Sequence, residues 1–299
     1  GILRDSLGFT GLTVTDALNM GALVASLGAD EAPVLAFLAG ADMLLQPADP
    51  AVTIAAMERA VRSGRITEAR LNRSVRRILE LKRRAHLFER RTVSLDSVPA
   101  VVGQAAFLES ARAITARSIV LARDNGGAVD SLRAAPRTVT LVAYGDETSP
   151  SAGTPLAGEL RSLGHRVTVV RLSPNSNTTS YDSVRTMLDA SPYALFAVAV
   201  RASAWRGTIG IPAALAALMD STAAARPTVL VSLGSPYVAA QAPHVGSYLL
   251  GWSAGTVSEQ AVAHALSGAE ISGHLPVRVP PDLPLGSGLE RPAITRGAP

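Results

Sequence analysis

The sequence predicts an α/β protein with a mainly parallel sheet, and three observations support this class. Short apolar segments rich in β-branched residues alternate with helical segments along most of the 299 residues. Some of these segments, such as 194–200, are almost continuously apolar, as strands are when helices cover both faces of a parallel sheet. The chain is 47% hydrophobic and 17% charged, so it can bury a substantial core and is not disordered.

Residues 1–86 are expected to form two β/α units. The predicted elements are strands over 12–14 and 41–45, helices over 30–39 and 52–62, and a third helix from Thr67. Asp30 is a suitable N-cap for the first of these helices. The third helix carries apolar residues at helical spacing, which predicts one buried face. Those residues are Leu71, Val75, Ile78 and Leu79.

The positive charge of the chain is concentrated around that third helix. The formal net charge is only +4, yet residues 62–91 carry eleven basic residues and three glutamates. Arginines at the polar positions are expected to form a solvated face, with their aliphatic stems partly buried. No aromatic residue interleaves the arginines of the helix to stack on bases, so a nucleic-acid partner is not expected.

Residues 87–103 interrupt the pattern with Pro99 and Gly103 and are expected to be a linker. Alternation resumes over 104–280, which predicts a mainly parallel α/β/α sandwich domain. The predicted strands are 118–121, 138–143, 166–170, 194–200, 228–232 and 247–250. The predicted helices are 104–115, 156–163, 183–188, 212–222 and 258–266. Residues 281–299 are rich in Pro and Gly and are expected to form a loose tail.

The composition excludes several kinds of site. Without cysteine there can be no disulfide, no thiolate zinc site and no cysteine nucleophile. Neither a cluster with metal-ligand spacing nor a phosphate-binding glycine motif occurs, so no metal and no cofactor are expected. The longest apolar runs are about 8 residues, whereas a bilayer needs roughly 20, so no membrane span is expected. The compartment, cytoplasmic or exported, and the oligomeric state stay open.

Asp16 is the first candidate for a functional residue. Functional side chains of parallel α/β structures gather at the carboxyl ends of strands, and Asp16 directly follows the predicted strand. On position alone, the carboxylate could equally cap the turn that follows.

The residues around Asp16 resemble a known family. The run from Leu3 to Ala22, with Thr15-Asp16-Ala17-Leu18-Asn19-Met20 at its centre, closely resembles the nucleophile segment of glycoside hydrolase family 3. Further similarities follow in the order of that family. They are 39–45, like its last barrel strand; 63–66 and 74–82, like its closing helices; and 233–237 and 273–277, like turns of its sandwich domain. The resemblance implies that residues 1–86 are the last two β/α units of a TIM-type barrel.

The same resemblance implies a retaining exo-glycosidase with Asp16 as the nucleophile. The Asp-Ala-Leu-Asn-Met run is most like the β-N-acetylhexosaminidase branch, whose substrate carries a terminal β-linked N-acetylhexosamine. In the β-glucosidase branch a bulky aromatic residue usually follows the aspartate, whereas this chain has Ala17. Asn19 and Met20 are expected to contact the substrate.

The acid/base partner of Asp16 is not evident. The hexosaminidase branch uses a histidine in an Asp-Ser-His loop, and this sequence has no such loop. Its five histidines follow the barrel segment and are expected to be structural or solvated. In the β-glucosidase branch a glutamate of the sandwich domain is the acid, and Glu147 is the one loop candidate. The acid/base is therefore expected to lie outside this chain, with Glu147 as the alternative.

The length of the barrel segment leads to a prediction about activity. A (β/α)8 barrel takes about 250 residues, whereas residues 1–86 provide two strands. The chain is therefore expected to be a C-terminal fragment of a two-domain bacterial enzyme and to be inactive alone. Two alternatives remain open: a β-glucosidase-type hydrolase, and a non-catalytic carbohydrate-binding or scaffold module.

Overall fold

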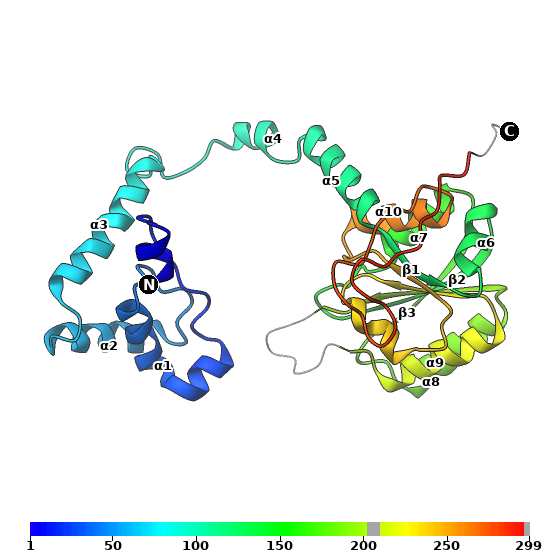
Figure 1. Ribbon diagram of the computed structural model, residues 1–299, viewed down its shortest axis with the longest axis horizontal. Helices are drawn as coiled ribbons and strands as arrows, with labels where there is room; N and C mark the ends of the chain where they lie inside the picture. The colour runs from blue at the N-terminus through cyan, green and yellow to red at the C-terminus, as the bar shows by residue number, and fades with distance from the viewer. Residues whose placement is uncertain (202–209, 296–299) are drawn as a thin grey trace. The chain divides into compact units, whose positions relative to one another are not determined.

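The computed structural model describes residues 1–201 and 210–295, and the chain divides into two compact units (Figure 1). Unit 1 is Gly1–Val102 and unit 2 is Gly103–Pro299. The α/β class and the mainly parallel sheet are confirmed, and the sheet lies entirely in unit 2.

Unit 1 is mostly helical. Its elements are the π-helix η1 (Ile2–Ser6), α1 (Gly21–Leu38), α2 (Pro50–Arg62), α3 (Glu68–Arg84), the 3-10 helix η2 (Leu95–Ser97) and α4 (Val98–Val101). Asp49 caps α2 by accepting hydrogen bonds from two backbone amides, and Thr67 caps α3 in the same way with one. The first helix starts nine residues earlier than predicted and bends at Gly28, where φ is +79°.

The two predicted strands of unit 1 are much shorter than expected. They reduce to a single parallel bridge between Val14 and Met43. A strand is stabilised by partners on its edges, and among the described residues each of these segments pairs only with the other. Accordingly Val14 is 51% exposed and Met43 41% exposed.

The expected buried face of α3 is also wrong. Val75 and Leu79 are more than 40% exposed, and the one buried residue of the helix is Ser74. The apolar cluster of unit 1 is small because its buried residues come from α1, α2 and the turn before α3, while α3 adds only the partly buried Leu71. It consists of Val34, Phe37, Ala56, Ala60 and Ile66.

Helix α1 needs comment because its length and composition alone would allow it to cross a membrane. The prediction of no span rested on uninterrupted apolar runs, and α1 breaks its apolar sequence with Asp30 and Glu31. It also contains Pro33, bends at Gly28 and packs its C-terminal half against α2. Only 22% of α1 is buried, and its buried residues lie in the half that packs against α2.

Unit 2 is a three-layer sandwich around one six-stranded sheet. Its helices are α5 (Ala105–Ser118), α6 (Ala128–Ala134), α7 (Thr154–Ser162), α8 (Thr178–Asp189), α9 (Ala213–Ala225), the 3-10 helix η3 (Pro236–Gln241) and α10 (Thr256–Leu266). Its strands are β1 (Val120–Asp124), β2 (Thr138–Gly145), β3 (Arg166–Leu172), β4 (Tyr193–Ala199), β5 (Thr228–Ser232) and β6 (Ser247–Leu250). The strand order is β1-β6-β5-β4-β2-β3.

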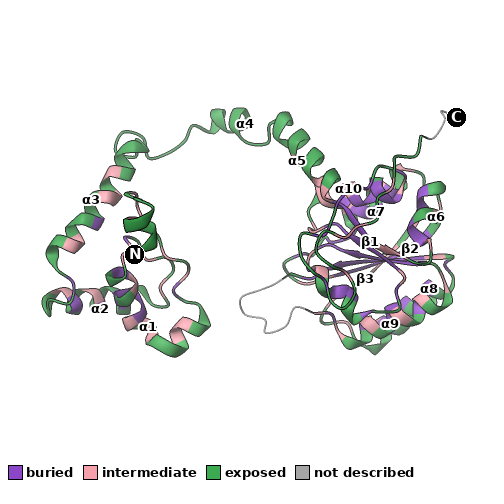
Figure 2. Ribbon diagram, in the orientation of Figure 1, coloured by how far each residue is buried: buried purple, intermediate pink, exposed green. Residues whose placement is uncertain are grey.

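Both faces of the sheet are covered (Figure 2). One apolar cluster joins the sheet to α8 and α9, and the other joins it to α6, α7 and α10. The sheet residues at the centre of these clusters, such as Leu195 and Phe196, are fully buried. This two-sided burial explains why the strand sequences are almost continuously apolar.

Three features of unit 2 differ from expectation. Strand β1 runs antiparallel to β6, and the seven-residue helix α6 was not predicted. The expected loose tail is instead attached to the sandwich as far as it is described: Leu289 and Ile294 donate backbone hydrogen bonds to Leu121 and Gly268. Arg291 also forms an ion pair with Asp130. Residues 296–299 of the predicted tail lie outside the described residues.

Candidate functional site

Asp16 is exposed at the carboxyl end of the short parallel pair in unit 1. Backbone hydrogen bonds tie the flanking residues to the neighbouring segment, from Thr15 N to Met43 O at 3.1 Å and from Leu18 N to Leu45 O at 2.9 Å. The Asp16 carboxylate accepts a hydrogen bond from the amide of Ala17 at 2.7 Å. The backbone that carries this carboxylate is therefore fixed, while its side chain stays open to solvent.

The two residues predicted to contact the substrate, Asn19 and Met20, lie three and four residues after Asp16. Asn19 is an exposed turn residue, and Met20 precedes the first residue of α1 and is 38% exposed. Both are accessible on the loop that begins at Asp16. Their contact with a substrate remains a prediction.

A second carboxylate, Asp42, lies behind this loop and is completely buried. Its Oδ2 accepts hydrogen bonds from the amide and the hydroxyl of Thr13, each at 3.1 Å. Its Oδ1 accepts one from Ser74 Oγ at 2.5 Å. Asp42 thus joins the segment that leads to Asp16, the following segment and helix α3.

Three arginines surround the Asp42 carboxylate. Arg4 Nη2 lies 2.7 Å from Oδ2, whereas Arg77 Nη1 and Arg70 Nη1 lie 3.1 and 3.5 Å from Oδ1. Arg70 also donates to the carbonyls of Phe37 and Ala41 and stacks on the Phe37 ring at 4.1 Å. We call Asp42 with Arg4, Arg70, Arg77, Thr13 and Ser74 the Asp42 cluster.

The Asp42 cluster corrects the expectation that the arginines of α3 form a solvated face. The side chains of Arg70 and Arg77 are only 15% and 31% exposed. A signal for this was present, because Arg70, Ser74 and Arg77 share one helix face at spacings of four and three residues. The total charge of the segment does not reveal this shared face, because it ignores the position of each arginine on the helix.

The surroundings of Asp42 keep it ionised. Burial by itself would raise the pKa of this carboxyl group. Hydrogen bonds from Ser74, Thr13 and Arg77 outweigh burial and hold the pKa of Asp42 far below its usual range. Because three cations face one anion, the cluster carries net positive charge directly behind the strand that ends at Asp16.

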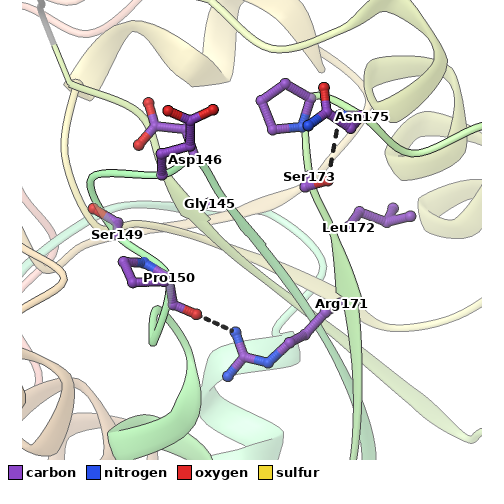
Figure 3. A pocket seen from close by; sticks show the side chains of 10 residues that line it. Gly145, Asp146, Ser149, Pro150, Arg171, Leu172, Ser173 and Asn175 are labelled. Carbon is purple, nitrogen blue, oxygen red and sulfur yellow. Dashed lines mark hydrogen bonds between the residues drawn. The ribbon is translucent and has the colours of Figure 1, made fainter.

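Glu147 lies in unit 2, in the loop after β2. It is exposed and lines a cavity of about 440 Å³ at the carboxyl ends of β2 and β3. Figure 3 shows this cavity, with Asp146 on one side and Ser173 and Asn175 on the other. The predicted site residues therefore fall in both units: Asp16, Asn19 and Met20 in unit 1, and Glu147 in unit 2.

The histidines are not gathered into a site. Four of them face a single carboxylate each, at 3.1 to 3.7 Å, and His165 is buried with its Nδ1 accepting from the amide of Arg137 at 3.2 Å. No group of three or more metal-ligating side chains occurs among the described residues.

The sequence of this chain is similar to those of known proteins. Residues 1–81 match the model of the glycosyl hydrolase family 3 N-terminal domain. A β-N-acetylglucosaminidase/β-glucosidase of Cellulomonas fimi is 28% identical over 295 residues, which is 92% of this chain and 50% of that protein. A periplasmic β-glucosidase/β-xylosidase of Dickeya chrysanthemi is 39% identical over 92 residues, 31% of this chain and 14% of that protein.

Two solved structures have a similar fold. A family 3 β-N-acetylglucosaminidase from Paenibacillus sp. str. FPU-7 superposes with a TM-score of 0.75 at 24% identity, over 91% of this chain and 52% of that one. A Listeria innocua β-glucosidase in complex with isofagomine gives 0.65 at 20% identity, over 91% and 41%. This chain spans about half the length of the first relatives it matches.

Proposed function

We propose that this chain belongs to glycoside hydrolase family 3 and carries the nucleophile of a retaining exo-glycosidase of the β-N-acetylhexosaminidase type. The observation that supports this most directly is Asp16. It is an exposed carboxylate on a fixed loop, at the carboxyl end of a parallel segment, inside the residues that match the family model.

In the proposed reaction a carboxylate oxygen of Asp16 attacks the anomeric carbon. The bond from that carbon to the leaving oxygen breaks, and an acid protonates the leaving oxygen. The covalent glycosyl-aspartate is then hydrolysed by water, which the same acid, now a base, deprotonates. The chemistry requires an ionised Asp16.

The acid/base is proposed to come from outside this chain. Within the chain, Glu147 is the alternative, because it is an exposed carboxylate on the loop after β2. If Glu147 acts, unit 2 takes part in catalysis. If the acid is supplied elsewhere, Glu147 is dispensable for turnover.

The sugar specificity is proposed from the residues next to the nucleophile. Ala17 leaves space beside Asp16, and Asn19 could hydrogen-bond a polar substituent such as an N-acetyl group. A β-glucosidase specificity is the second candidate, because the names of the relatives include β-glucosidase beside β-N-acetylglucosaminidase. A non-catalytic carbohydrate-binding module is the third, and it does not require a carboxylate at position 16.

The test compares the chain as it stands with a chimera in which the N-terminal part of the Cellulomonas fimi relative precedes Gly1. We expect the chain alone to release no aryl group from an aryl β-N-acetylglucosaminide or an aryl β-glucoside, and the chimera to hydrolyse the former faster. Asp16→Asn should reduce turnover by about 1,000-fold or more, because the nucleophile is lost. Glu147→Gln tests the acid/base: turnover by the chimera should fall if Glu147 is the acid, and should stay unchanged if the acid is supplied elsewhere.

Two results would count against the proposal. Rapid turnover by the 299 residues alone would show that the chain contains its own acid/base. A folded, active chimera that Asp16→Asn leaves unchanged would remove Asp16 from the mechanism.

A further inference from the structure

The two edge strands of the sheet in unit 2, β1 and β3, differ in how the chain covers them. Beside β1, the segments after α10 cover the edge: Leu289 N donates to Leu121 O at 2.7 Å, and Gly273 N donates to Ile119 O at 3.2 Å. Strand β3 pairs with β2 on one side, and no segment of residues 1–201 or 210–295 pairs with its other side. An uncovered edge strand presents backbone groups that can pair with another chain.

The backbone groups of β3 point alternately toward β2 and away from it. Arg166 N donates to Arg137 O at 2.9 Å on the side of β2, and the register with β2 is unbroken as far as Leu172. Because the direction of hydrogen bonding alternates along a strand, every second residue after Arg166 also faces β2, and the residues between them face outward. The outward residues are Val167, Val169 and Arg171.

The burial of the strands agrees with an open edge at β3. All residues of β3 except Leu172 are exposed or only partly buried, whereas every residue of the central strand β4 after Tyr193 is buried. Helices cover the faces of β3, since Val169 contacts the apolar cluster on one face and Val170 the cluster on the other. The exposure of β3 therefore comes from its uncovered edge.

One side chain limits access to this edge. The guanidinium of Arg161, on α7, donates to the outward carbonyl of Val167 through Nε at 3.1 Å and Nη2 at 2.6 Å. The outward amide and carbonyl of Val169 have no partner among the described residues. A carbonyl oxygen has two lone pairs, so Val167 O can still accept from a second strand if Arg161 shifts. Arg161 thus acts as a guard at one position of an otherwise open edge.

The sequence of β3 suits pairing with another strand. It has seven residues, contains no proline and pairs with β2 without a bulge, so it lacks three of the features that usually protect an edge. Its central residues are uncharged and β-branched, which favours a strand. They are Val167, Thr168, Val169 and Val170.

A second copy of β3 matches this edge when the two strands run antiparallel with Val169 opposite Val169. The two valines then exchange both backbone hydrogen bonds, and Thr168 lies opposite Val170 of the second copy. At about 3.4 Å per residue, the two copies of Arg171 are offset by roughly 14 Å and the two copies of Arg166 by roughly 20 Å. Arg166 and Arg171 point to opposite faces of the sheet, so no two arginines lie side by side on one face.

We propose that β3 is a self-association edge, through which two copies of this chain join their sheets into one, and that Arg161 weakens this pairing. The contact between two edge strands is smaller than a standard protein interface, so the dimer is weak and forms as the concentration rises. The inference concerns assembly and does not depend on the proposed glycosidase activity.

The test combines sedimentation velocity with amide hydrogen exchange on the full chain, from micromolar to millimolar concentration. We expect a monomer that becomes a dimer over this range. The amide of Val169 should become protected from exchange as the dimer forms, whereas the amide of Val170, which faces β2, should be protected at every concentration. This contrast separates pairing at β3 from association through other exposed side chains.

Val169→Pro is the decisive variant, because it removes the outward amide and leaves the ladder to β2 intact. The dimer would lose two hydrogen bonds, one from each copy, so its dissociation constant should rise about tenfold or more. Val169→Thr is the matched control, since it keeps the amide and the β-branched shape, and it should not change dimerisation. Arg161→Ala should lower the dissociation constant severalfold.

Two results would overturn the inference. One is that the chain and Arg161→Ala both stay monomeric at millimolar concentration, as they would if β3 were to accept only a strand of a different protein. The other is association that Val169→Pro leaves unchanged, which would place the contact elsewhere. Thermal unfolding of each variant shows whether a loss of association is a loss of fold.

Discussion

The two units bury a carboxylate in opposite ways. In unit 1, Asp42 is surrounded by three arginines, and its hydrogen bonds overcome the effect of burial, so its pKa is lowered. In unit 2, Glu259 accepts hydrogen bonds from the backbone amides at the start of α7, and burial outweighs these bonds and the nearby charge of Arg171, so its pKa is raised. The same chemical group is thus held by charge in one unit and by surrounding apolar structure in the other.

This difference follows from the packing of each unit. Unit 2 has two extensive apolar clusters, one on each face of its sheet. Unit 1 has a cluster of five buried residues and many exposed apolar side chains. Its polar cluster around Asp42 therefore contributes a larger share of what holds its segments together. The proposed nucleophile lies in the unit with the smaller core.

The largest effect is expected from Asp42→Asn. Removing one partner from a buried ion pair typically costs about 3–5 kcal/mol. The cost here should be at the lower end, because the three arginines lose their counter-charge but stay 15–31% exposed. Unit 1 should unfold at lower denaturant concentration, while unit 2 should not change. Both tryptophans, Trp205 and Trp252, belong to unit 2, so their fluorescence follows that unit and amide exchange in α1–α3 follows unit 1.

The matched control is Glu80→Gln, which removes a surface carboxylate from α3, the helix that carries Arg70 and Arg77. Glu80 pairs with Arg83 and Arg84 at the surface, where ion pairs contribute little. It should leave the unfolding midpoint unchanged. Equal effects of the two substitutions would remove the special role of Asp42.

A smaller effect is expected from Glu259→Gln. The amide keeps one acceptor oxygen and loses the other, so one of the two α7 amides is left without its partner. We expect a loss of about 1–3 kcal/mol, measured by tryptophan fluorescence on denaturation and confined to unit 2. A change in amide exchange of α1–α3 instead would contradict the assignment of this contact.

The smallest effect should be a difference in pH dependence. The pKa of Asp42 is lower in the folded state than its ordinary value of 3.8, so its contribution is present above that value and declines as the pH falls below it. The pKa of Glu259 is raised above its ordinary value of 4.5. Protonation of Glu259 as the pH falls therefore removes the cost of burying its charge and favours the folded state of unit 2. Acidification from pH 5 to 3 should therefore weaken unit 1 relative to unit 2. Asp42→Asn should reduce that difference, and persistence of the full difference in the variant would exclude Asp42 as its cause.

The sequence was most informative where packing is periodic. Strands β2 to β6 lie within about two residues of their predicted positions, because two-sided burial makes each an apolar run with polar ends. The antiparallel direction of β1 was not predictable, since strand direction depends on the path of the chain and not on the strand's own residues. Helix α6 was missed because it has only seven residues.

The candidate site was predictable only in part. Asp16 and its neighbours were found from a local motif, whereas the Asp42 cluster was missed because it joins residues of three separate segments. Nothing in the residues next to Asp42 indicates that it is buried, since acidic residues are usually found at the surface. Arg70 and Arg77 are partly buried because they pair with Asp42, which lies about 30 residues earlier in the chain.

The Asp42 cluster also has a consequence for the order of folding. Its hydrogen bonds join residues 29 to 38 positions apart, so loops of that length must close before any of them forms. Because one carboxylate receives all of these bonds, a unit 1 that lacks any of the contributing segments gains only part of the stabilisation. The segment that leads to Asp16 is therefore expected to reach its final position late and in one cooperative step with α3.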